Sequence, residues 1–367
     1  MTIRNANMDV MVICFDASSD AKNALDELLG SGEFKNISEV ISMSLLNYQV
    51  IRHAVAEGGG QTLIETGVAN HAEDGRKDAE PKVPFAKIPE VFRAVQGDST
   101  GLSLVEPERV RSTGAEAPPK DWLWGQYNRF LPAKATCRAL LNLMGKNPAG
   151  LPVDDAVAKI SYAACGLGDF LNSIDMRLQL SRENAMKAAF PTSDINGGES
   201  RLRFGNQFVG TFKQEKLQGF PADLKLVVSE GGKEPKLLLT KAGAAFADLA
   251  NPVLDTRDEF PRTRLSDEEI AFLLSHIKEY VPQELSAFIC VIDGIESGAN
   301  TPDGLDSYVR TRFNLSEAAM KASFLSTQRT GVVSRMVDLG LLARAKEGLR
   351  VTYVTTHPGK YFRSQIA

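Results

Sequence analysis

The last hundred residues combine helical patterning with a final hairpin. Apolar side chains recur three and four positions apart after Ser266 and Glu269, whose spacing is that of a capping box, so a helix is expected to start there. The same periodicity predicts further helices over residues 284–295, 303–313, 315–324 and 326–339, the last ended by Gly340. Two short apolar strands are then predicted over Leu341–Ala345 and Leu349–Thr355, with a tip at residues 346–348.

An internal repeat is visible in the second half of the chain. Ala185–Phe190 aligns without gaps with Ala319–Phe324, 134 residues later, and each phenylalanine is followed seven residues on by a glycine. Further along, residues 236–246 and 351–362 share a strand that ends in threonine, a glycine-containing turn and an aromatic residue. Internal repetition predicts two related domains, over residues 122–256 and 262–367.

The N-terminal pattern predicts one strand and two helices. The strand covers Asp9–Phe15, the first helix ends at Gly30–Gly32, and the second runs from about Asn36 to Gly58–Gly60. A segment of roughly 45 residues is too small to close a core alone, and an unpaired strand exposes a row of backbone groups. Both problems disappear if two chains pair their strands, so residues 1–56 are predicted to be a dimerisation module. An ordinary small α/β domain is the alternative.

Between these parts, residues 57–121 show weak periodicity and many prolines, and only residues 88–95 favour a short helix. This composition is typical of a mobile tether. A partner-binding segment that folds on contact is the alternative.

Composition is that of an ordinary globular protein and excludes several classes. The 367 residues are 43% hydrophobic and 24% charged, which suits two or three domains. No run reaches the ~18 apolar residues of a membrane span, and the N-terminus lacks a secretory pattern. The four cysteines and four histidines are dispersed. We therefore expect a cytoplasmic protein with reduced thiols, no metal site, no cofactor and no membrane partner.

Charge is distributed unevenly along the chain. The formal net charge is -4, yet residues 309–367 hold ten basic and three acidic residues, a surplus of +7 that leaves -11 for residues 1–308. This asymmetry predicts an anion-binding C-terminal part. A solvated basic face is the alternative.

Motifs for enzyme chemistry are absent from the sequence. Gly58–Gly60 lacks the strand, the lysine and the hydroxyl residue of a phosphate loop. Carboxylate pairs such as Glu268–Glu269 stand at predicted helix starts, where they favour the helix dipole. A nuclease would need a metal-binding carboxylate cluster, and none can be assembled, so no enzyme is expected. The aromatic residues Trp122, Trp124, Tyr127 and Phe130 are interpreted as core packing rather than as a base-stacking platform.

Residues Gly32–Ile41 resemble the inter-helix turn of the ribbon-helix-helix family, and the resemblance extends over residues 8–55. It implies a homodimer with antiparallel paired strands. The strand's outward residues are apolar here and cannot hydrogen-bond to bases, so the module is interpreted as a dimeriser first and a DNA reader second. The expected dimer contacts are Val10, Val12, Cys14, Phe15, Val40, Ile41, Leu45 and Tyr48.

The C-terminal part resembles the winged helix-turn-helix superfamily in the order of its predicted elements: helix, turn, helix, the run Asp338–Leu342 and a basic hairpin. The repeat extends this resemblance to about residues 122–250. The resemblance implies that the second helix enters the major groove by its N-terminal turn while the hairpin follows the backbone. Predicted DNA contacts are Ser326, Thr327, Gln328, Arg329 and Thr330 in that turn, Arg335 further along the helix, and Arg344, Lys346 and Arg350 around the hairpin.

Together these patterns predict a predominantly helical α+β protein: a ribbon-helix-helix module followed by two winged-helix domains. We expect a homodimer that binds specific double-stranded DNA sequences and regulates transcription. An adaptor or structural subunit of a larger nucleoprotein complex, in anti-invader defence or plasmid maintenance, is the alternative. Phe190–Leu202 has a net charge of -1 and the matching Phe324–Met336 has +2. The C-terminal domain is therefore expected to read bases, and the middle one to pack or to contact a protein partner.

Overall fold

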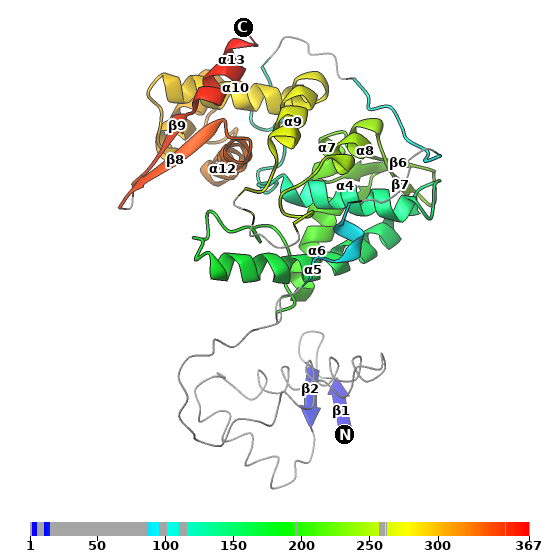
Figure 1. Cartoon of the computed structure of the whole chain (residues 1–367). Coiled ribbons are helices and arrows are strands. Elements are labelled where there is room, and N and C mark those ends of the chain that lie inside the picture. Colours follow the sequence, from blue (N-terminus) through cyan, green and yellow to red (C-terminus); the bar gives the residue numbers. More distant parts are fainter. Residues whose placement is uncertain are drawn as a thin grey trace, which may run out of the picture. The chain divides into compact units, whose positions relative to one another are not determined.

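The structure is a computed structural model that describes residues 2–5, 11–14, 87–94, 101–109, 116–194, 197–256, 261, 263–348 and 350–366. It is α+β, with many helices and small antiparallel sheets (Figure 1). The chain divides into two compact units, residues 1–82 and 83–367. Both C-terminal repeats belong to the second unit, and the division between the units falls within residues 57–121, the predicted linker.

In the first unit the described residues form one antiparallel hairpin. Strand β1 (Thr2–Asn5) pairs with β2 (Met11–Cys14), with Ile3 opposite Ile13. The predicted strand is thus confirmed over its central residues, but the expectation that it lacks a partner within its own chain is wrong, because Thr2–Asn5 covers one edge. The two predicted helices lie outside the described residues. So do the side chains of the expected dimer contacts Val10, Val12, Cys14, Phe15, Val40, Ile41, Leu45 and Tyr48.

The first half of the second unit is built around α4 and a three-stranded sheet. The strand order is β3-β7-β6, all antiparallel, and β4 and β5 form a separate hairpin. The elements are α4 (Leu131–Met144), β3 (Leu151–Pro152), α5 (Val153–Arg177), α6 (Gly197–Phe204), the π-helical turn η2 (Gly205–Val209), β4 (Thr211–Lys213), β5 (Lys216–Gln218), α7 (Phe220–Asp223), β6 (Val227–Glu230), β7 (Lys236–Leu239) and α8 (Lys241–Asp248).

The second half has four helices, a hairpin and a last helix: α9 (Asp267–Tyr280), α10 (Pro282–Glu296), α11 (Pro302–Arg312), α12 (Ala322–Asp338), β8 (Leu342–Glu347), β9 (Arg350–Thr355) and α13 (His357–Ser364). The predicted capping box of Ser266 and Glu269 is confirmed at the start of α9. The helix predicted over residues 315–324 is wrong. Asn314 has a left-handed φ of 50°, residues 313–321 form turns, and α12 begins at Ala322. Ser326–Thr330 therefore lie in the second turn of α12 rather than the first.

The backbone repeats its features in the two halves. Thr240 and Thr356 each follow the last strand of their sheet, and each side chain caps the next helix by accepting from the N–H of a glycine three residues on. Thr240 N donates to Leu226 O at 3.0 Å, and Thr356 N donates to Leu341 O at 3.1 Å. The backbone of residues 236–246 and 351–362 thus agrees with the repeat that their sequences predicted.

The halves differ in the stretch before the sheet. In the second half α12 is unbroken over 17 residues. In the first half the corresponding stretch is divided into α6, η2, the β4–β5 hairpin and α7. It ends at Asp223, which precedes Leu224 as Asp338 precedes Leu339. The first half thus lacks a continuous helix in this place.

Residues 87–121, where described, pack against the body of the unit: residues 87–94 and Val105 against the first half, and residues 116–119 against the second. The short 3-10 helix η1 (Glu90–Phe92) buries Phe92, and Ile88 is buried beside it. Val105 N donates to Leu239 O at 3.3 Å, and Lys241 N donates to Val105 O at 2.8 Å. The prediction of a mobile tether is therefore wrong for residues 87–94, 101–109 and 116–121, because their apolar side chains and backbone groups find partners on the body.

Buried ion pairs join the two halves. Lys134 Nζ lies 2.9 Å from Glu269 Oε1, and both side chains are fully buried. Asp338 is buried with its Oδ1 3.8 Å from Nε of Arg129 in the first half, and burial raises the pKa of its carboxyl. A buried ion that loses its partner is strongly destabilising, so these pairs fix how the halves pack. Among the described residues, no helix has both the length and the apolar character that a membrane span needs.

Candidate nucleic-acid interface

The inner side of α12 packs against residues 116–130. Gly125 and Gly331 meet there so closely that a Cβ on Gly331 would lie 2.2 Å from Gly125 O. The expected aromatic packing is confirmed in the same place, since Trp122, Tyr127 and Phe130 are buried, while Trp124 keeps 38% of its surface exposed. One side of the helix expected to read bases is therefore covered by protein.

Gln328 belongs to that covered side. Its side chain is 1% exposed, Oε1 accepts from Gly125 N at 2.5 Å, and Nε2 donates to Pro119 O at 2.9 Å. A side-chain amide whose donor and acceptor are both engaged by backbone has little left to offer a base edge. Its predicted DNA contact is not compatible with this structure.

The two arginines of α12 are buried as well. Arg329 is 6% exposed, and its Nε donates to Asp306 Oδ1 at 2.7 Å. Arg335 is fully buried, and its guanidinium bonds to Glu284 and to the carbonyl of Tyr127. The predicted DNA contacts of both arginines are corrected here, because their guanidinium groups bind side chains and backbone groups of the same chain.

The outer side of α12 carries three hydroxyl residues. Ser326 and Thr327 are half-buried and Thr330 is exposed. Thr327 Oγ1 donates to Ser323 O at 2.9 Å, and Thr330 Oγ1 donates to Ser326 O at 2.7 Å. Each threonine oxygen keeps acceptor capacity. Of the five residues predicted in this turn, these three keep a surface that a ligand can reach.

All three hydroxyl residues border a hollow of about 930 Å³ between the two halves. The opposite wall comes from the first half, and the side chains that line the hollow include no carboxylate. Below, "the hollow" means the space lined by Gly125, Gln126, Asn128, Arg129, Arg182, Ala185, Lys187, Ala188, Ala189, Phe190, Thr192, Arg203, Gln207, Ser326, Thr327 and Thr330.

The β8–β9 hairpin projects from its half (Figure 1) and carries basic residues toward its tip. Lys346 pairs with Val351 in the ladder, and Arg350 follows the tip; both are exposed. Arg344 is half-buried and its Nη2 donates to Ser334 Oγ at 2.7 Å. The tip thus presents two of the three predicted cations, and the third is turned back onto α12.

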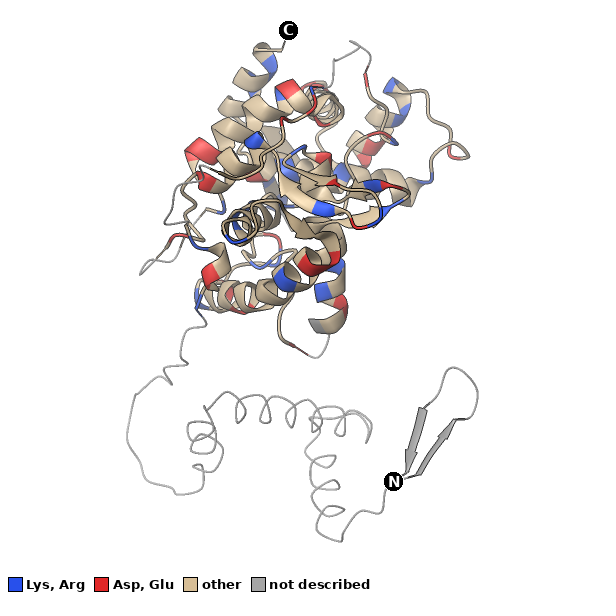
Figure 2. Cartoon of the chain, turned by 90° about the vertical axis from the view of Figure 1, so that its right-hand side faces the viewer, with Lys and Arg blue, Asp and Glu red and all other residues tan. Residues whose placement is uncertain are grey.

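Much of the basic surplus after residue 308 is neutralised by acids from other elements. Six of its ten basic side chains form ion pairs, for example Arg312 with Glu116 and Asp293. The others are Arg310 with Glu317, Arg329 with Asp306, Arg335 with Glu284, Lys360 with Glu296 and Arg363 with Asp293. Along the described ribbon, positions of Lys and Arg alternate with positions of Asp and Glu (Figure 2). Summing charge along the sequence therefore overstated the positive field.

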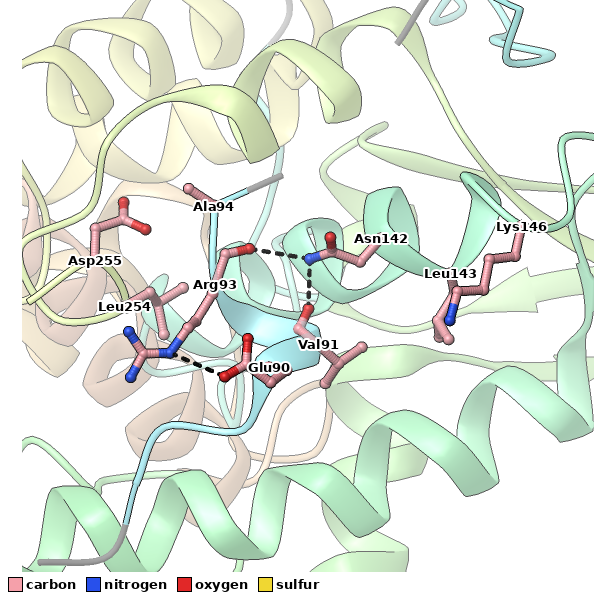
Figure 3. Close-up of a pocket in the computed structure, with 9 residues that line it drawn as sticks. All are labelled: Glu90, Val91, Arg93, Ala94, Asn142, Leu143, Lys146, Leu254 and Asp255. Atoms are coloured by element: carbon pink, nitrogen blue, oxygen red, sulfur yellow. Dashed lines mark hydrogen bonds and ion pairs between the residues drawn. The ribbon is translucent and has the colours of Figure 1, made fainter. Parts of the chain in front are cut away.

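A second hollow, of about 910 Å³, lies beside α4 and η1 (Figure 3). Its polar groups are engaged with each other: Asn142 Nδ2 donates to Val91 O at 2.8 Å and to Arg93 O at 3.0 Å, and Arg93 lies 3.8 Å from Glu90. We build no site on it.

The described part of the chain has dispersed metal-ligand side chains and three free cysteines, Cys137, Cys165 and Cys290. No cluster of three or more histidine, cysteine or acidic side chains is placed there to hold a metal ion. Burial raises the pKa of both Cys137 and Cys290 to about 12, which keeps these thiols protonated and poor nucleophiles. A comparison of the chain with models of known families, with curated proteins and with solved structures finds no match.

Proposed function

We propose that this protein binds specific sequences of double-stranded DNA as a homodimer and regulates transcription. The support is the order of elements in the second half of the unit, where α11, a turn, α12 and the β8–β9 hairpin follow one another as in a winged helix-turn-helix domain. The first half, with its own terminal hairpin and capped last helix, is the second copy. The dimer is assigned to residues 1–82, through the free edge of the β1–β2 hairpin or the segment that follows it.

One observation carries the proposal: the face of α12 not covered by protein presents Ser326, Thr327 and Thr330, hydroxyl side chains suited to base edges and phosphates. The exposed Lys346 and Arg350 at the hairpin tip are assigned to the DNA backbone. The covered side of α12 is assigned a structural role, in which Gln328, Arg329 and Arg335 hold the helix in position.

The test is fluorescence anisotropy with a labelled DNA duplex of about 30 base pairs of randomised sequence, titrated over a range of salt concentrations. Lys346→Ala with Arg350→Ala should flatten the slope of log K against log salt by up to ~1.8, since each phosphate contact contributes ~0.9. At about 0.1 M salt the association constant should fall by up to roughly 60-fold. Lys159→Ala with Lys360→Ala removes two exposed cations on α5 and α13 and is the matched control.

No binding by the unaltered protein would refute the proposal, and equal slopes for the tip and control variants would refute the role of the hairpin. Selection of bound fragments from a random pool then tests sequence preference. For the dimer, sedimentation should give two chains for the full protein and one for residues 83–367, which form a compact unit with their own core. A dimeric 83–367 fragment would move the interface to that unit.

The second candidate is an adaptor that binds DNA weakly until a protein partner joins it. It is favoured by two apolar side chains on the first half, Tyr162 on α5 at 72% exposed and Leu202 on α6 at 63%. The two helices that carry them, α5 and α6, pack against each other, and apolar side chains that gather on a surface mark protein contacts. Micromolar or weaker binding of the purified dimer to every selected duplex would favour the adaptor, and tight binding to one sequence would favour the regulator.

A further inference from the structure

We propose that the hollow between the two halves holds the DNA backbone, so that the first half binds the same stretch of DNA as α12. This inference rests on the proposed function and adds a second set of binding residues to it. Those residues are Arg182, Lys187 and Arg203, none of which was predicted from the sequence to contact DNA.

The two walls of the hollow come from different copies of the repeat. One wall is the second turn of α12, with its three hydroxyl residues. The other is formed by residues 182–192 together with Arg203 of α6 and Gln207 of η2. Within that wall Ala185–Phe190 is the segment that aligns with Ala319–Phe324, directly before α12. The hollow therefore lies where the corresponding parts of the two copies come together.

The charge of the hollow suits a polyanion. Arg182 and Arg203 are exposed, Lys187 is half-buried, and no carboxylate is among the lining residues. Lys187 Nζ donates to the neutral Asn172 Oδ1 at 2.7 Å, and among the described residues no carboxylate lies within ion-pair distance of it. Arg203 pairs with Glu199 one helical turn away at 2.9 Å, and such exposed pairs are weak enough for a phosphate to displace. Three cations on one wall thus face the hydroxyl residues on the other.

Two buried polar atoms in residues that line the hollow also lack hydrogen-bond partners among the described residues. They are Asn128 Oδ1, an acceptor, and Nε of Arg129, whose side chain is buried beside Asp338. Buried polar atoms are rarely left unpaired in folded proteins. Of the two, the N–H at Arg129 Nε is the kind of donor from which a phosphate oxygen accepts.

The size of the hollow favours a chain of phosphates over a single small anion. About 930 Å³ is at the upper end of the ~300–1,000 Å³ typical of ligand pockets. The space is bordered by basic, amide and hydroxyl side chains from both halves. This combination is what a backbone contact needs, because phosphates are bound by cations, amides and hydroxyl groups without regard to sequence.

The test compares three variants in the same anisotropy assay and on the same random duplex. Arg182→Ala, Lys187→Ala and Arg203→Ala together should flatten the salt slope by up to ~2.7 and lower the association constant up to roughly 500-fold at about 0.1 M salt. Lys146→Ala, Lys159→Ala and Lys360→Ala remove the same charge from exposed sites away from the hollow and should change the slope little. Thr330→Glu places a negative charge on the opposite wall and should weaken binding about eightfold, and Ser364→Glu on α13 is its control.

The outcomes separate this inference from the proposed function. If the unaltered protein binds no duplex, the proposed function fails. If it binds, and the hairpin-tip variant is weakened while the hollow triple variant keeps the affinity and slope of its control, only this inference is overturned. Thermal unfolding of each variant checks the fold, and Arg182→Ala with Arg203→Ala, both exposed, replaces the triple variant if that one unfolds.

Discussion

Replacement of Arg335 by methionine should destabilise the second unit more than any surface change. Both Arg335 and Glu284 are fully buried, with Nε 2.5 Å from Oε1 and Nη2 2.8 Å from Oε2, and the third guanidinium nitrogen donates to Tyr127 O. Without the arginine, the Glu284 carboxylate stays buried without its cation, which costs about 3–5 kcal/mol. The Tyr127 carbonyl loses its donor, which costs roughly another 1 kcal/mol.

The double variant Glu284→Leu with Arg335→Met should recover most of this loss. A buried ion pair replaced by apolar side chains of similar volume is often neutral, so the double variant should lie within about 2 kcal/mol of the unaltered protein. Exposed Arg350→Ala is the control and should change stability by about 0.5 kcal/mol or less.

Urea unfolding followed by tryptophan fluorescence measures these differences. The chain has two tryptophans, Trp122 and Trp124, and the rings of both contact phenylalanines of the second half, so the signal reports on this packing. The reasoning is refuted if Arg335→Met costs less than about 1 kcal/mol, or if the double variant is no more stable than the single one.

Three further predictions follow from buried or crowded positions. Burial raises the pKa of Asp223 from 3.8 to about 6, so its ionisation lowers the stability of the fold as pH rises through this window. In urea titrations at several pH values, Asp223→Asn should stabilise the protein by about 1–2 kcal/mol near neutral pH, and the gain should vanish below pH 3.8. A pH-independent effect would contradict this cause. Gly331→Ala should lower the free energy of unfolding by about 3 kcal/mol or more in the same assay, because the added carbon would meet the backbone of Gly125. The control Gly198→Ala has open space around it and should be neutral or stabilising. Arg329→Ala should lower the free energy of unfolding by about 1–3 kcal/mol and leave the base preference of selected DNA unchanged. A changed preference at one base pair would show that Arg329 contacts DNA after all.

Local pattern was sufficient for most elements of the second half. The helix expected over residues 284–295 is α10, from Pro282 to Glu296, and the expected hairpin is β8–β9 within a few residues. Helix caps, apolar periodicity and glycine stops act over a few residues, so they can be read from the chain. The error at residues 315–324 arose because apolar spacing there is helical, while Asn314 and the residues after it form turns.

The candidate site was harder to predict because its state depends on distant residues. Gln328 and Arg335 have the chemistry of DNA contacts. Nothing near them in sequence shows that their polar groups instead form hydrogen bonds with the backbone of Gly125 and Tyr127. Arg182 and Lys187 lie before the Phe190–Leu202 window whose charge was counted, so the basic wall of the hollow was missed. The repeat was the one sequence signal that connected this wall to α12.

The buried pairs between the halves also set an order of events during synthesis. Lys134 meets Glu269, and Tyr127 meets Arg335, only after well over a hundred further residues have been made. At about 5–20 residues per second, the first half waits on the order of ten seconds or more with Lys134 lacking its carboxylate. Contacts between residues so far apart in sequence also slow folding. The first half should therefore remain incompletely packed on the ribosome, exposed to chaperones and proteases, until α12 emerges.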